Sequence, residues 1–211
     1  MADLLDDSPL AEWLRLSEAL QAGLVHALNN RITALSAFAE LAELGDDALT
    51  AQSVLPRELS LLHQLNGLFR LLVSDTSTAE ALEVGPVLDD ALALHAHHPS
   101  FRSLRCTVMR QSDLPPVRTP RGALLRVLLL IIEHVKEEAE ATGDGTMTLT
   151  VEADERELSV SAARSRGLGR YALALAERCG GTLEIGASTT RFSLPTLAEL
   201  RRREKARTNS D

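Results

Sequence analysis

A histidine followed by two asparagines is the first place in the chain where side chains could do chemistry. His26, Asn29 and Asn30 lie in a segment whose apolar residues recur at spacings of three and four, as in an amphipathic helix. At about 100° per residue, Asn30 and Thr33 share the face of His26, opposite Leu24 and the rest of the apolar stripe. The pattern predicts an exposed imidazole on a rigid helix, where a neutral ring nitrogen can act as a nucleophile.

Two long helices are expected to position this histidine. The first spans Gln21 to Leu44, and the pattern leaves open whether Ala11 to Ala19 continues it. Gly45 to Ser53 is predicted to be a polar loop, and the second helix is expected from near Pro56 to about Ser74. The apolar positions of the second helix are Leu55, Leu59, Leu61, Leu62, Leu65, Leu68, Phe69, Leu71, Leu72 and Val73. They exceed what one helix can cover, so we expect a homodimeric four-helix bundle, the alternative being packing within one chain.

The pattern changes after a polar linker, Asp75 to Glu80. Apolar spacing then predicts a helix (84–98), a strand (104–108), a long helix (123–141), a strand hairpin (147–151 and 158–162), a helix (167–178) and two strands (183–185 and 192–194). The predicted class is α+β. A helical hairpin forms residues 1–76, an α/β sandwich follows in 77–197, and the tail 198–211 is a frayed helix end with disorder.

Composition limits the classes of function. The chain has 211 residues, of which 45% are hydrophobic and 25% charged, as in an ordinary globular protein. Its net charge of −8 argues against a general nucleic-acid binder, and no apolar run is long enough to cross a membrane. Cys106 and Cys179 form neither a disulfide framework nor a metal motif, so we expect a cytoplasmic protein. The triplet His95, His97 and His98 is interpreted as a solvated helix end without metal.

Residues 26–35 (HALNNRITAL) resemble the phospho-acceptor box of two-component histidine kinases. His26, Leu28, Asn29 and Asn30 match that box. Ala27 replaces the acidic residue that assists the histidine in the family, and a basic residue replaces the proline. General acid–base assistance of this kind typically contributes about 10²–10⁴-fold, so the substitution weakens the case for an autokinase.

The second half resembles the ATP-binding domain of the same family in three places. These are residues 123–139, similar to the N-box helix, 167–186, similar to the last glycine-rich box, and 188–197, similar to the terminal strand. The chain differs from the family at the positions that bind the nucleotide. Leu130 and His134 stand where the family has metal-binding asparagines, and Ala162 and Ala163 stand where it has an adenine-binding aspartate. The lid is reduced to about four residues, and the remaining Gly167 and Gly169 are interpreted as packing and turn residues.

Taken together, the chain resembles bacterial histidine phosphotransferases that carry a degenerate kinase ATPase domain. The resemblance implies that His26 accepts phosphate from, or donates it to, the aspartate of a response-regulator receiver domain. It further implies that Asn30 positions a water or the phosphoryl group, and that Asn29, Arg31 and Thr33 contact the receiver. The receiver supplies Mg²⁺, an upstream histidine kinase or hybrid kinase supplies phosphate, and the chain itself is expected to bind neither ATP nor a metal.

Two other functions remain open at this point. The first is a non-catalytic pseudo-histidine-kinase that serves as a scaffold or regulator, with His26 incidental. The second is an atypical active histidine kinase, which retained Mg-ATP binding would favour. Phosphatase activity toward a receiver, dependent on Asn30, is a subsidiary hypothesis to the phosphotransferase.

Overall fold

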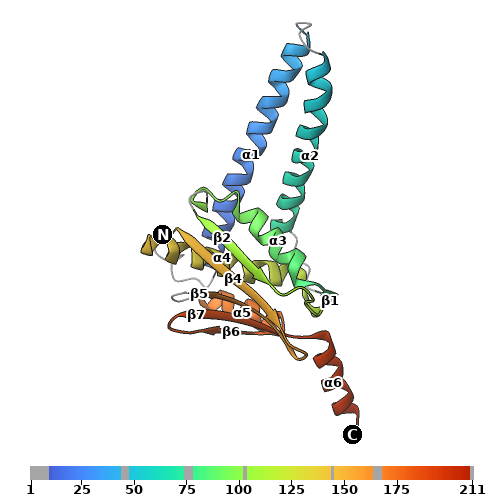
Figure 1. The fold of residues 1–211 in the computed structure, drawn as a ribbon, viewed down its shortest axis with the longest axis vertical. Helices are drawn as coiled ribbons and strands as arrows, with labels where there is room; N and C mark the ends of the chain where they lie inside the picture. The colour runs from blue at the N-terminus through green and yellow to red at the C-terminus, as the bar shows by residue number, and fades with distance from the viewer. Residues whose placement is uncertain are drawn as a thin grey trace.

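The computed structural model describes residues 10–43, 48–73, 78–101, 104–143, 145–163 and 168–209. In these residues a long helical hairpin stands on a body of helices and strands formed by residues 78–195, which we call the sandwich (Figure 1). The elements are α1 (Ala11–Glu43), α2 (Ala48–Val73), β1 (Ala79–Leu82), α3 (Val84–His95), β2 (Arg105–Arg110), β3 (Val117–Pro120), α4 (Arg121–Thr142), β4 (Thr146–Ala153), β5 (Glu157–Ala163), α5 (Arg170–Arg178), β6 (Thr182–Ile185), β7 (Thr189–Pro195) and α6 (Leu197–Thr208). This mixed architecture agrees with the predicted α+β class, while the dimeric bundle stays a prediction.

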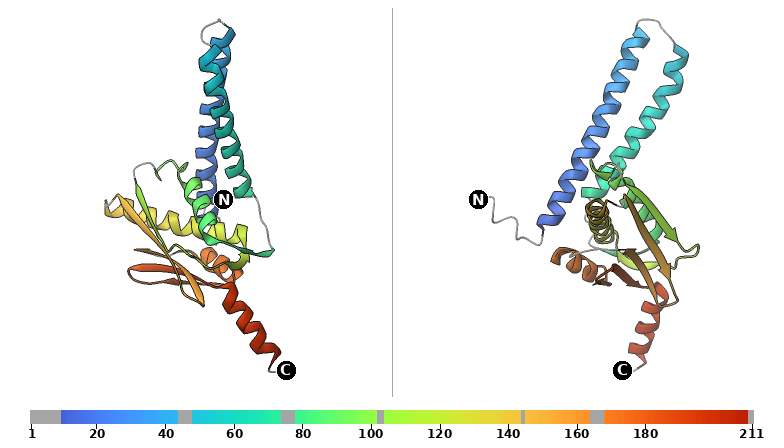
Figure 2. Two further views of the ribbon diagram at one scale, coloured as in Figure 1. Left: turned by 45° about the vertical axis from the view of Figure 1, so that its right-hand side comes forward. Right: turned by 60° about the vertical axis from the view of Figure 1, so that its left-hand side comes forward.

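The hairpin consists of two antiparallel helices (Figure 2). Helix α1 is continuous, which answers the question that the sequence pattern left open for its first nine residues. Helix α2 begins at Ala48, so the predicted loop is wrong for residues 48–53, while Gly45 lies outside the described residues. Pro56 therefore sits inside the helix, on its exposed side. Packing of Leu65 and Leu72 in the core outweighs the low helix propensity of the proline.

The main sheet of the sandwich has five strands in the order β2-β4-β5-β7-β6. Only the β2–β4 pair is parallel, and β4 and β5 form the predicted hairpin, with Leu149 opposite Ala162 and Val151 opposite Val160. Along β4, Met147, Leu149 and Val151 are buried and alternate with more exposed residues, as expected for a sheet with one buried face.

A second sheet of two strands was missed from the sequence. Strands β1 and β3 pair antiparallel, with Ala79 opposite Pro120 and Leu82 opposite Val117. The prediction had placed residues 75–80 in a linker and 120–122 in a turn. A four-residue strand whose residues are mostly exposed carries too little alternation to be identified, because its only partner is distant in the sequence.

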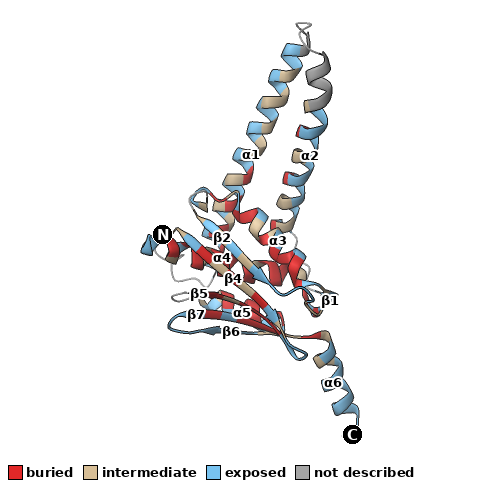
Figure 3. Cartoon of the chain, viewed as in Figure 1, coloured by how far each residue is buried: buried red, intermediate tan, exposed pale blue. Residues whose placement is uncertain are grey.

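The core is shared between the hairpin and the sandwich. Helix α4 is buried along most of its length and ends at Gly143, which adopts the left-handed conformation with φ of 68°. Leu16, Leu20 and Leu24 of α1 belong to the same cluster of buried residues as α4 and the strands. Figure 3 shows the resulting contrast, with the buried residues concentrated in the sandwich and at the base of the hairpin.

The disorder predicted for the tail is wrong for residues 198–208, which belong to helix α6 (Leu197–Thr208). Its first turn is capped by Thr196, whose side-chain oxygen accepts a hydrogen bond from the backbone N–H of Glu199 at 3.1 Å. An ion pair of 2.8 Å between Arg203 and Glu199 follows one turn later. No residue of α6 is buried, and the helix projects away from the sandwich. Across the described ranges, no helix is both long and apolar enough to span a bilayer.

Candidate phospho-acceptor site

His26 is exposed on α1, as the helical spacing predicts. The side-chain amide of Asn30, one turn further along, lies 3.2 Å from His26 Nε2. With the amide nitrogen as donor, Nε2 accepts and the ring proton is on Nδ1. This is the neutral tautomer, in which Nε2 carries the lone pair. The amide therefore lies within reach of any group that Nε2 attacks.

The neighbouring residues divide between two sides of α1. Asn29 and Thr33 are exposed, as expected for residues that could contact a partner. Arg31 lies about 140° around the helix from His26. Its guanidinium donates to both carboxylate oxygens of Glu58, a buried residue of α2, each at 3.3 Å. The structure thus shows Arg31 in a contact within the hairpin, and its role in receiver binding stays a prediction.

A cavity of about 700 Å³ opens between the hairpin and α3. Ala27 and Arg31 line it from α1, Leu61, Leu65 and Leu68 from α2, and Ala93 from α3. An ion pair of 2.6 Å between Arg121 and Asp90 forms part of its wall. Ala27 and Arg31 lie about 100° and 140° around α1 from His26, so the cavity opens on a different side of the helix from the histidine.

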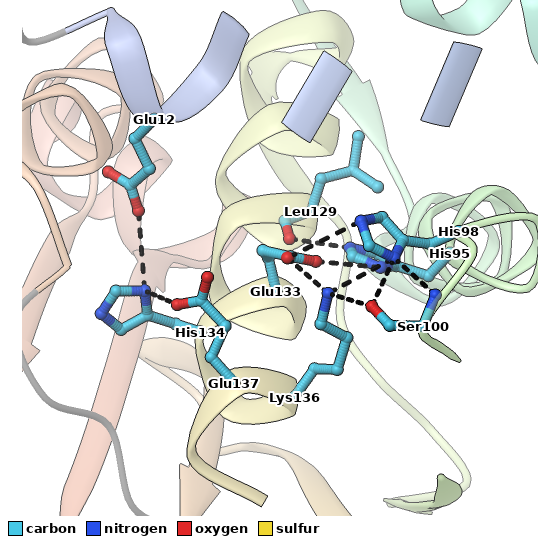
Figure 4. A network of polar contacts seen from close by, with 9 residues as sticks. All are labelled: Glu12, His95, His98, Ser100, Leu129, Glu133, His134, Lys136 and Glu137. Carbon is cyan, nitrogen blue, oxygen red and sulfur yellow. Dashed lines mark hydrogen bonds and ion pairs between the residues drawn. The ribbon is translucent and has the colours of Figure 1, made fainter. Parts of the chain in front are cut away.

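Internal contacts engage the positions where the resemblance would place nucleotide ligands. Leu130 is fully buried in the core, and Ala162 is buried in β5. His134 Nδ1 lies 3.6 Å from a carboxylate oxygen of Glu12 (Figure 4). The other oxygen accepts a hydrogen bond of 3.2 Å from the backbone N–H of Gly169. Gly167 lies outside the described residues, as does the side chain of Ala163.

Glu12 was not identified from the sequence as a residue of this region. Burial raises the pKa of its carboxyl group, an effect that His134 and the Gly169 N–H oppose. A single acidic residue in the first turn of a helix gives no sequence signal beyond a favourable helix-dipole interaction. Only the fold brings Glu12 next to α5, since 157 positions separate it from Gly169.

Two of the three histidines at the end of α3, His95 and His98, are buried, contrary to the prediction of a solvated helix end. His95 is fully buried and donates from Nε2 to the backbone carbonyl of Leu129 at 2.9 Å, and burial lowers its pKa to about 3. His98 is buried beside Lys136 and Glu133 (Figure 4). A sequence signal existed, because His95 follows the buried Ala91 at i+4 and so lies on the apolar face of α3.

His95 and His98 belong to a cluster of polar side chains at the end of α3. Lys136 lies within hydrogen-bond distance of Glu133 and donates to Ser100 Oγ at 3.2 Å. Among the described residues, no group of three or more His, Cys, Asp or Glu side chains is arranged to hold a metal ion. The lysine pairs with the glutamate, as a buried charge requires.

Comparison with known proteins gives structural similarity without a sequence family. No protein-family model matches the chain, and no curated protein matches it. The chain is similar to the histidine kinase AdeS of Acinetobacter baumannii, at 14% identity and a TM-score of 0.45, over 82% of this chain and 98% of that one. It is also similar to the histidine kinase ThkA in complex with the response regulator protein TrrA, at 17% identity and a TM-score of 0.46, over 89% of this chain and 64% of that one. A third similar structure is a bacterial phosphotransferase, at 14% identity and a TM-score of 0.40, over 85% of this chain and 95% of that one.

Proposed function

We propose that this protein is a histidine phosphotransferase of a two-component phosphorelay, acting in the cytoplasm. In this proposal His26 carries phosphoryl groups to and from receiver-domain aspartates. The observation that carries it is the exposed imidazole on α1 with the Asn30 amide 3.2 Å from Nε2. Asn29 and Thr33 are exposed beside it and would contact the receiver.

The transfer needs little from this chain beyond a positioned nucleophile. The Nε2 lone pair attacks the phosphorus of the receiver's aspartyl phosphate, the bond between phosphorus and the carboxylate oxygen breaks, and the aspartate leaves as a carboxylate. The Nδ1 proton remains on the ring, and the reverse reaction loads the next receiver. Mg²⁺ bound by the receiver neutralises charge on the phosphoryl oxygens. This chain then lowers the activation barrier mainly by orienting the His26 imidazole, since α1 holds the ring on a rigid helix.

The exposed apolar residues of the hairpin support a homodimer. Val25 and Ile32 of α1 and Leu55 and Leu59 of α2 are 45–50% exposed in the single chain. Extended apolar surface of this kind is typical of protein–protein interfaces. A second copy of the hairpin would cover these residues in a four-helix bundle and leave His26, on another side of α1, free for the receiver.

The contacts around α4 and α5 support a phosphotransferase in preference to an ATP-dependent autokinase. A buried leucine at position 130 has no oxygen to offer Mg²⁺. The N–H of Gly169, at the start of α5, already donates to the carboxylate of Glu12. The proposal therefore takes its phosphate from an upstream histidine kinase or hybrid kinase through a receiver, and assigns no ATP or metal to this chain.

Phosphate transfer from a radiolabelled, phosphorylated receiver tests the proposal. We expect label to move onto the wild-type protein and onto the His63→Ala variant, whose substituted histidine is exposed on α2. We expect none on His26→Ala. Full transfer to His26→Ala would overturn the assignment and leave a non-catalytic scaffold as the better interpretation.

The subsidiary phosphatase role needs a separate measurement. If Asn30 orients a hydrolytic water, Asn30→Ala will lower the rate of inorganic phosphate release from the receiver more than the rate of transfer to His26. Equal losses in both rates would instead indicate that Asn30 only holds the imidazole.

A further inference from the structure

The first half of α1 is packed into the sandwich and does not stand free above it. Trp13, Leu16, Leu20 and Leu24 recur at three- and four-residue spacing and are all buried in the shared core. The Arg126 guanidinium of α4 lies 5.1 Å from the centre of the Trp13 ring, within cation–π range. One face of α1 is therefore an internal layer of the sandwich over about three turns.

A polar contact joins the first turn of α1 to α5 and α4. One oxygen of Glu12 accepts a hydrogen bond from the backbone N–H of Gly169 at 3.2 Å. The other oxygen lies 3.6 Å from His134 Nδ1 (Figure 4). The carboxylate thus sits at the positive end of α5, where a negative charge is favoured. The fit is close, because a Cβ added to Gly169 would collide with the same carboxylate oxygen.

A third contact joins the middle of α1 to the end of α3. A Cβ added to Gly23 would overlap the backbone carbonyl of His97. The two backbones therefore approach to a distance that only glycine permits. This contact lies three residues before His26, so the support of the sandwich reaches almost to the histidine.

We propose that these contacts form a lock that holds the sandwich in one fixed position against the His26 helix, with Glu12 as its polar latch. The lock joins α1 to α3, α4 and α5 through apolar burial, a charged hydrogen bond and close backbone packing. Their combination at separate points along α1 removes both hinge and slide motions between the two parts. The inference goes beyond the proposed function, since it holds whatever His26 does.

The lock has a consequence for binding. Because the hairpin and the sandwich keep one relative position, a partner that contacts both meets a preorganised surface, which lowers the entropy lost on association.

Pulsed electron spin resonance on the full chain tests the lock. Spin labels at the exposed positions Glu40 of α1 and Glu152 of β4, in a background with Cys106 and Cys179 replaced by Ala, report the distance from the hairpin to the sandwich. Dilution with unlabelled protein removes distances between chains of a dimer. We expect one narrow distance distribution, and a broadened or split one after Glu12→Arg.

The matched control is Glu18→Arg, which makes the same charge change at an exposed position on the same helix. It is expected to leave the distribution narrow. A broad distribution in the unsubstituted chain, or one unchanged by Glu12→Arg, would overturn the proposal. If Glu12→Arg fails to fold by circular dichroism, Glu12→Gln replaces it as a variant of the same size. Glu12→Gln is expected to broaden the distribution to a smaller extent, and an unchanged one would count against the latch.

Discussion

The two parts of α1 differ in their surroundings although they belong to one uninterrupted helix. We call the part up to Leu24 the first half and the part from Val25 onward the second half. In the first half Leu16, Leu20 and Leu24 are buried in the core shared with the sandwich. In the second half residues of the same apolar character, Val25, Ile32 and Leu41, are 45–50% exposed. The polar residues also differ in their surroundings, since Glu12 is held by the sandwich whereas His26 faces solvent beside Asn30.

This difference shows how one helix serves two purposes. The first half contributes to stability and fixes the direction of the helix. The second half carries the candidate nucleophile, and it exposes apolar surface that a second copy of the hairpin would cover in the proposed dimer. Substitutions in the first half should therefore act on folding, and substitutions in the second half on association and transfer.

A matched pair of leucine substitutions gives the largest expected difference between the halves. Leu20→Ala removes a fully buried side chain and should lower the free energy of unfolding by about 2–5 kcal/mol. Leu41→Ala, at a half-exposed position, should change it by less than about 0.5 kcal/mol. Urea denaturation at low protein concentration measures both, and equal losses would contradict the contrast.

The sandwich, against which the first half of α1 packs, should become less stable in acid. Burial lowers the pKa of His95 to about 3, from 6.5 for an unperturbed histidine, so the unfolded chain binds its proton more tightly than the folded protein does. The His95 contribution is therefore complete above about pH 6.5 and is lost as the pH falls toward 3. The slope is at most about 1.4 kcal/mol per pH unit.

Denaturation curves between pH 7 and pH 4 measure this effect in the wild type and in His95→Gln. The variant should show a flatter dependence, although some slope remains because burial also lowers the pKa of His98. An equally steep curve in His95→Gln would show that other groups cause the acid sensitivity.

Two glycines in the hairpin should respond to alanine with opposite signs. Gly23→Ala forces a methyl group against the His97 carbonyl and should cost about 1–3 kcal/mol. Gly67 of α2 has no atom within 4 Å of an added Cβ, so Gly67→Ala should stabilise the protein by about 0.5–1 kcal/mol through helix propensity. Thermal melts of the two variants compare them directly, and destabilisation by both would remove the argument for close docking at Gly23.

A charged residue among the exposed apolar residues of the second half of α1 should have the smallest effect on the folding of the single chain. Ile32→Asp is expected to change monomer stability by less than about 0.5 kcal/mol, since Ile32 is half exposed. Its effect should appear in association, because an aspartate in an apolar interface must be desolvated. Light scattering over a range of concentrations should find dimers of the wild type and of Thr33→Asp, and monomers of Ile32→Asp. Monomers of all three would contradict the homodimer.

Some features of the fold can be predicted from the local sequence pattern, and others depend on contacts between residues that are distant in the sequence. The long helices and the β4–β5 hairpin were predicted because apolar spacing of 3.6 or 2 residues reports directly on secondary structure. Strands β1 and β3 were not, because their pairing joins short segments that are far apart in the sequence. Helix α6 was predicted only as a frayed helix end, since its cap depends on one threonine and its ion pairs on single side chains.

The candidate site divides in the same way. The exposure of His26 and its position one turn from Asn30 follow from helical periodicity alone, because both residues lie on one short piece of regular backbone. The burial of His95 depends on the packing of α3 on α4. The hydrogen bonds from Arg31 to Glu58 depend on the packing of α1 on α2. The attachment of Glu12 to Gly169 and His134 depended on the whole fold. Sequence determines which face a residue occupies on its own helix, and only the tertiary structure decides what that face meets, because long-range contacts form between segments whose separation no local pattern records.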